Sequence, residues 1–127
     1  MEVLYCKKFK PRWAIRAMSL ENILKEEVTN ISCEIIALAG SAKSAFIESI
    51  RAAKEDDLEK AKELLEVGYE QFHQAHNIHA SLLKRFADGE NIDINIILVH
   101  AECLLTSAED FKVISHEVVE FAEKNKK

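Results

Sequence analysis

Residue 100 is a histidine in the most apolar stretch of the chain, and its surroundings suggest chemistry at a ring nitrogen. Between residues 94 and 105 the only plainly polar side chains are Asn95, His100 and Glu102. A neutral imidazole nitrogen can attack phosphorus and hold the phosphoryl group as a labile phosphoramidate. Apolar surroundings favour that neutral form, because desolvation disfavours the charged one. His100 is therefore a candidate nucleophile, and the alternative is a core histidine whose nitrogens are both hydrogen-bonded.

The other four histidines carry a weaker signal. His73, His76 and His79 are spaced by threes, and no Asp or Glu lies between them. Successive steps of three drift around a helix, so only adjacent pairs could share a metal ion. His79 falls on an apolar seam and is interpreted as a core histidine, whereas His73 and His116 are interpreted as surface residues.

The composition predicts an all-α domain that holds these residues on long helices. The chain of 127 residues has only three Gly and one Pro, and Ala, Leu, Glu and Lys are abundant. Apolar residues recur at steps of three and four over residues 19–53, 58–86 and about 93–123. Short loops between three such helices predict an antiparallel, up-down-up hairpin bundle within residues 18–127.

Polar residues mark the expected helix boundaries. Asp56 followed by Glu59 has the form of a capping box for the second helix, and Gly89 is expected just past its end. Residues 92–99 alternate in a way that also fits a strand. Because a lone strand would have no partner in the chain, a third helix with Asp93 as its N-cap is predicted instead.

The third helix is predicted to be apolar on most sides. His100, Cys103, Ser107 and Asp110 would share one face. An adjoining apolar stripe would be formed by Ile97, Ala101, Leu104, Ala108 and Phe111. A helix of this kind has to be buried on most sides, which a hairpin of three helices does not achieve alone. Self-association of the chain is therefore expected.

The charge distribution argues against nucleic acid as a partner. The formal net charge is −5, but residues 1–17 hold five basic residues and one acidic residue, so the other 110 carry −9. An acidic body repels a phosphate backbone.

The cysteine content is typical of a cytosolic protein, because three cysteines without close pairing, and no signal peptide, suit a reducing compartment. No apolar run approaches the roughly 20 residues that cross a bilayer, so a soluble protein is expected.

Residues 1–17 differ from the rest of the chain, and two interpretations compete. They are basic and contain Phe9 and Trp13, so they could form an arm that binds a partner or a membrane surface. Alternatively, Met18 is the true start and the segment is a disordered extension.

Four segments resemble one known family. They are AGSAKS at residues 39–44, AKEDDLEKAKELL at 53–65, QAH at 74–76 and LVHAECLLT at 98–106. Over residues 31–123 the chain is similar to the lactose/cellobiose-type enzyme IIA of the bacterial sugar phosphotransferase system. The resemblance implies a nine-helix homotrimer in which His100 accepts a phosphoryl group from the phosphocarrier HPr and passes it to a cysteine of enzyme IIB. The membrane component, enzyme IIC, then transports and phosphorylates the sugar.

The chain departs from the family pattern directly after His100. The family sequence continues with a small residue, Gln, Asp, His and Leu, and here these positions hold Ala101, Glu102, Cys103, Leu104 and Leu105. Cys103 replaces the Asp that binds a divalent ion, Mg²⁺, on the family's trimer axis. Three thiols on an axis could hold a softer ion such as zinc, but packing is the commoner role of a buried cysteine. No cofactor is expected to be required.

Glu102 and His76 are the expected binding neighbours of His100. Glu102 would repel an incoming phosphoryl group if it faced the site, and would matter little if it faced away. The alternative to a working carrier is a trimeric paralogue that keeps a partner surface and transfers phosphate weakly or not at all.

Overall fold

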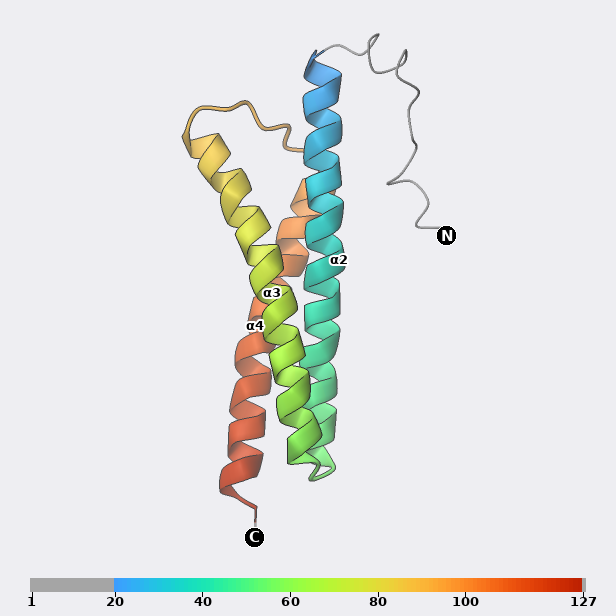
Figure 1. Cartoon of the computed structure of the whole chain (residues 1–127), viewed down its shortest axis with the longest axis vertical. Coiled ribbons are helices and arrows are strands. Elements are labelled where there is room, and N and C mark those ends of the chain that lie inside the picture. Colours follow the sequence, from blue (N-terminus) through green and yellow to red (C-terminus); the bar gives the residue numbers. More distant parts are fainter. Residues whose placement is uncertain (1–19, 127) are drawn as a thin grey trace, which may run out of the picture.

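Three long α-helices make up the part of the chain that the computed structural model describes, residues 20–126. They are α2, Leu20–Lys54, α3, Leu58–Ala87, and α4, Ile96–Lys124, and no strand occurs among these residues. The chain runs down α2, up α3 and down α4 (Figure 1). The predicted all-α, up-down-up hairpin bundle is confirmed, whereas the predictions on residues 1–17 fall outside the described residues.

The two connections lie at opposite ends of the bundle. Residues 55–57 form a tight turn in which Asp56 has a φ of 61°, whereas residues 88–95 arch across the other end (Figure 1). The prediction that Asp56 caps α3 is wrong. Asp57 is the N-cap, and its carboxylate accepts a hydrogen bond from the Lys60 amide at 3.1 Å. Asp56 takes the left-handed conformation that closes the turn, which leaves the next residue at the cap.

The end of α3 is fixed by a glycine and an arginine. Gly89 has a φ of +91° just past the helix, as the sequence predicted, and its amide donates to the Phe86 carbonyl at 3.0 Å. Arg85 donates to Glu90 in the connection and to Glu27 of α2. The hydrogen bond from the Arg85 guanidinium lowers the pKa of the Glu90 carboxyl. The connection is thereby tied to α2.

The interior divides into two clusters of apolar side chains. The larger one runs through the middle of the bundle and includes Ile35, Phe46, Leu65, Phe72, Leu105 and Val119. The smaller one lies beside the long connection and consists of Val28, Leu82, Ile92 and Leu98. Alanines occupy many of the remaining core positions, which lets the helices approach closely. At one such approach the fully buried Phe46 ring packs on α3 at Gly68.

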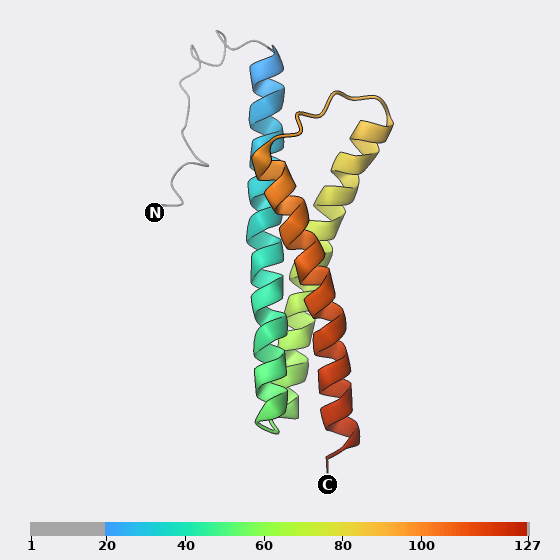
Figure 2. The same cartoon turned by 180° about the vertical axis from the view of Figure 1, so that it is seen from behind.

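The helices separate toward the end that carries the long connection. Figures 1 and 2 show the C-terminal end of α3 leaning away from α2, while α4 begins beside α2. A hydrogen bond from Asn95, at the start of α4, to Thr29 of α2 agrees with this arrangement. α4 therefore has α2 on one flank and a diverging α3 on the other at the level of His100. In the described part of the chain no helix combines the length and apolarity needed to cross a membrane.

Candidate functional site

α4 begins one turn before His100, and Asn95 fixes that turn. The Asn95 backbone is extended, with φ −110° and ψ 171°, and its side-chain oxygen accepts hydrogen bonds from the Ile97 and Leu98 amides, both at 3.0 Å. Its side-chain nitrogen lies 3.4 Å from the Thr29 hydroxyl of α2. One side chain thus caps α4 and ties it to the neighbouring helix. His100 is placed in the second turn that follows.

The prediction that Asp93 caps α4 is wrong. Asp93 instead accepts a hydrogen bond from the Asn95 side chain at 3.1 Å. The connection stays irregular through residue 95 because Ile92 is buried beside Leu98 in the smaller cluster, 8% and 5% exposed. α4 therefore begins at Ile96, four residues after the buried Ile92.

The His100 side chain is exposed. Within the described part of the chain its ring makes no hydrogen bond and no ion pair. A core histidine with both nitrogens bonded, the alternative weighed from the sequence, is therefore contradicted for a single chain. The exposed ring can be reached by an approaching group, and nucleophilic attack on phosphorus requires such access.

An uncovered apolar strip surrounds His100 on α4. We call it the outer strip, and its members are Ile96, Val99, His100, Cys103, Asp110, Ile114 and Phe121, all of which are exposed. Ile96 is 81% exposed and Phe121 is 70% exposed, which is unusual for side chains of this size. The side that the sequence predicts to be uncovered in a single hairpin holds Ile96, His100, Cys103 and Ser107, of which the first three are exposed and Ser107 is half-buried. The adjoining Leu98, Ala101, Leu105 and Ala108 face the core instead.

Glu102 lies on the opposite flank of α4 from His100. Its carboxylate oxygen Oε1 is 2.9 Å from Nε2 of His79 on α3. Two residues along an α-helix correspond to about 200° of rotation, so a side chain that contacts α3 points away from His100. Of the two orientations considered for Glu102, the structure has the one that keeps its carboxylate away from the nucleophile.

His76 is not brought to His100 within one chain. It lies exposed on α3, and its ring stacks on Phe72 with the centroids 5.9 Å apart and the planes at 28°. Because α3 is on the Glu102 flank of α4, His76 and His100 lie on different sides of that helix. Cys103, by contrast, is exposed on the outer strip, one turn beyond His100.

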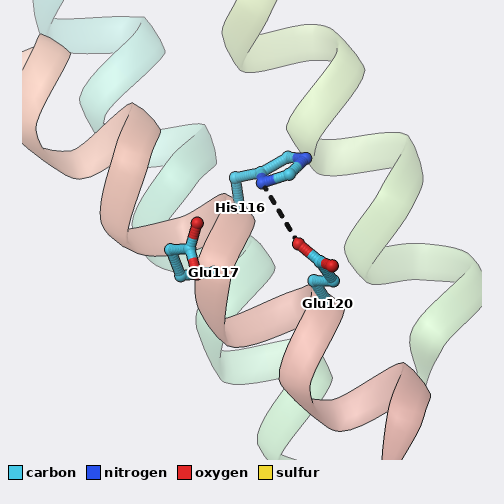
Figure 3. A group of neighbouring side chains, drawn as sticks. All are labelled: His116, Glu117 and Glu120. Atoms are coloured by element: carbon cyan, nitrogen blue, oxygen red, sulfur yellow. Dashed lines mark ion pairs between the residues drawn. The ribbon is translucent and has the colours of Figure 1, made fainter.

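One further cluster of potential metal ligands lies on α4 away from His100. Figure 3 shows His116, Glu117 and Glu120, whose ligand atoms lie within 4.8 Å of one another. The His116 Nδ1 is 3.9 Å from a Glu120 oxygen. His116 is exposed, in agreement with its interpretation as a surface residue, and its spacing of four from Glu120 is the sequence signal that indicates the pair. Glu120 is also paired with Lys124, whose hydrogen bond lowers the pKa of the Glu120 carboxyl.

A solved structure of another protein has the same fold. The structure superimposes with a TM-score of 0.72 on a crystal structure of the cellobiose-specific enzyme IIA from Bacillus anthracis, at 25% identity, covering 87% of this chain and 94% of that one. The fold and the site thus define a small all-α protein that exposes a histidine, His100, near the start of its third long helix.

The family can be stated directly. Residues 30–123 match the family model described as the lactose/cellobiose-specific IIA subunit of the phosphotransferase system, and the chain belongs to that family. It is 33% identical over 101 residues to the lichenan-specific enzyme IIA component of Bacillus subtilis, covering 80% of this chain and 92% of that protein. A lactose-specific IIA component of Staphylococcus aureus is 34% identical, covering 76% and 94%. The protein is therefore a phosphotransferase component, as the sequence resemblance indicated.

Proposed function

We propose that the chain is a cytoplasmic phosphoryl carrier that accepts phosphate from phospho-HPr on His100 and passes it to the cysteine of enzyme IIB. The observation that carries the proposal is the exposed His100 ring, in a family of phosphotransferase components. The sugars named for the relatives support a role of this carrier in the uptake of lactose- or cellobiose-type sugars through enzyme IIC. The carrier itself handles only phosphate.

The proposed chemistry takes place at one imidazole nitrogen of His100. The neutral nitrogen attacks phosphorus in line, a new N–P bond forms, and the bond between phosphorus and HPr breaks. In the second step a thiolate of enzyme IIB attacks the same phosphorus, an S–P bond forms, and His100 is released as a free imidazole. Glu102, held toward α3, keeps its negative charge away from the dianionic phosphoryl group.

Incubation of the wild-type protein with radiolabelled phospho-HPr tests the proposal. We expect a protein-bound phosphate that is labile in acid and stable in base, as a phosphoramidate is, and that is removed by enzyme IIB. Absence of label, while a lactose-specific IIA component is labelled in parallel, would contradict the proposal and favour the non-carrier paralogue.

We also propose that the apolar side chains of the outer strip are covered by two further copies of the chain, in the homotrimer that the family resemblance implies, and that the His100 ring stays reachable for HPr. A monomer would leave several large apolar side chains of one helix in water. Ile96, Val99, Ile114 and Phe121 lie on one side of α4, so packing of three copies of this helix around a common axis would bury all of them. Burial of these four side chains would also give the His100 ring apolar neighbours, which favour its neutral form.

Ile114→Lys tests the trimer. Ile114 is 49% exposed in one chain, and a lysine in its place would put three charges close together on the trimer axis. We expect light scattering to report a trimer for the wild type and a monomer for this variant. Val67→Lys is the matched control, because Val67 is 47% exposed but lies on α3. A wild type that is monomeric at micromolar concentration, or equal effects of both substitutions, would contradict the trimer.

The divalent ion of the family does not fit the donors on this strip. Mg²⁺ selects oxygen ligands, and at the relevant position the chain presents the thiol of Cys103. The nearest carboxylate further along the strip is Asp110, seven residues or about 10 Å away along the helix axis. We therefore propose that the assembly needs no Mg²⁺.

Cys103→Asp tests this difference. An aspartate from each copy would restore three carboxylates at one level of the axis, and an ion bound only by the folded trimer stabilises it by about 2.7 kcal/mol at 100 times its dissociation constant. We expect millimolar Mg²⁺ to raise the Tm of the variant and to leave the Tm of the wild type unchanged. An equal rise for the wild type would show that the ion binds without the carboxylate.

A further inference from the structure

One polar contact joins α3 and α4 at the level of the proposed phosphoacceptor. His79 Nε2 and Glu102 Oε1 are 2.9 Å apart, and the two side chains are 17% and 49% exposed. Glu102 is two residues from His100, in the same turn of α4. The contact therefore restrains the part of the helix that presents His100.

The orientation of His100 depends on how α4 is held. Within the described residues its ring has no hydrogen-bond partner that could aim it. The ring direction follows the rotation and height of the helix, and an in-line attack tolerates little error in either. Anything that fixes α4 about its own axis at this level also fixes the Cα–Cβ bond from which the His100 ring is presented.

The contact lies in the C-terminal third of α3. Figure 1 shows α3 diverging from the bundle toward its C-terminal end. Two other contacts between these helices lie progressively further from His100: Lys112 over the Phe72 ring at 4.5 Å, and the ion pair of Lys62 with Glu123 near the opposite end. Of these three, only the His79–Glu102 contact adjoins the site.

We propose that His79 and Glu102 are positioning residues for phosphoryl transfer, which lock the first turns of α4 against α3 and so aim His100. The inference rests on the proposed carrier function. The carboxylate has a second consequence, because its contact with the imidazole on α3 keeps it on the flank away from the incoming phosphoryl group.

The test compares two alanine variants that each remove one contact between α3 and α4. Glu102→Ala removes the contact beside His100, and Glu123→Ala removes the one with Lys62, where the carboxylate is similarly exposed. We expect Glu102→Ala to lower kcat for phosphate uptake from phospho-HPr about tenfold with little change in KM. Glu123→Ala should leave kcat unchanged. Glu102→Gln, which still accepts a hydrogen bond from His79, should restore kcat.

A substitution on the α3 side checks the same contact. His79→Phe should lower kcat as much as Glu102→Ala, and the double variant should be no slower than either single variant. Thermal unfolding of every variant confirms that it is folded at the assay temperature.

Equal kcat values for Glu102→Ala and Glu123→Ala, in a protein that does take up phosphate, would overturn the positioning role and leave the carrier function standing. A rise in KM without a change in kcat would also overturn it, since Glu102 would then contact the donor protein. A wild type that takes no phosphate would instead contradict the carrier function.

Discussion

His100→Ala will lose phosphate uptake from phospho-HPr, by at least about a thousandfold. The variant lacks the nitrogen that forms the bond to phosphorus, and no other histidine lies on the outer strip. Because His100 is exposed and its ring has no polar partner among the described residues, its removal should change the free energy of unfolding by less than about 0.5 kcal/mol. Uptake is measured as base-stable radiolabel, and stability by urea unfolding.

His73→Ala is the control for that substitution. His73 is also an exposed histidine on a long helix, but it lies on α3. The control should retain wild-type labelling. Equal labelling of His100→Ala and the wild type would remove His100 from the reaction.

Gly68→Ala will lower the free energy of unfolding by about 2 kcal/mol. A Cβ at residue 68 would lie 2.4 Å from Cε1 of Phe46, and Phe46 is fully buried between α2 and α3. Tyr69 packs beside the ring with the centroids 5.7 Å apart, which limits the space into which the ring can retreat. We therefore expect the helices to separate. The shift of the midpoint in urea measures the loss.

Gly40→Ala separates this steric effect from helix propensity. At residue 40 the added Cβ would meet only Leu104 Cδ2, at an ordinary contact distance of 3.7 Å. Alanine is favoured over glycine inside a helix, so this variant should gain up to about 1 kcal/mol. A gain of similar size for both variants would show that Phe46 has room to move.

The three-helix architecture could be predicted because the apolar periodicity of each helix extends over many residues. The helix boundaries are harder to predict, because neighbouring polar residues are alternative candidates for the same cap. Three helices follow from the spacing of apolar residues and from the scarcity of glycine and proline. Asp56 and Asp57 are chemically equivalent candidates for a cap, and the turn geometry decides between them. The N-cap of α4 is Asn95 rather than Asp93, because the chain stays irregular where it buries Ile92.

Only those features of the candidate site that depend on spacing along the chain could be predicted from the sequence. The position of His100 in an apolar run identified it, and helical spacing placed Cys103 and Asp110 on its face. The contact between His79 and Glu102 could not be found in this way, because it depends on the height of α3 relative to α4. The same limitation applies to Phe86, which continues the apolar period of α3 yet is 57% exposed where that helix diverges.

The location of the phosphate on the wild-type protein tests the carrier function most directly. After incubation with phospho-HPr, proteolysis at alkaline pH and tandem mass spectrometry identify the modified residue, since a phosphoramidate survives in base. We predict phosphate on His100 alone. Phosphate on another histidine or on a cysteine would contradict the assignment of His100 as the acceptor.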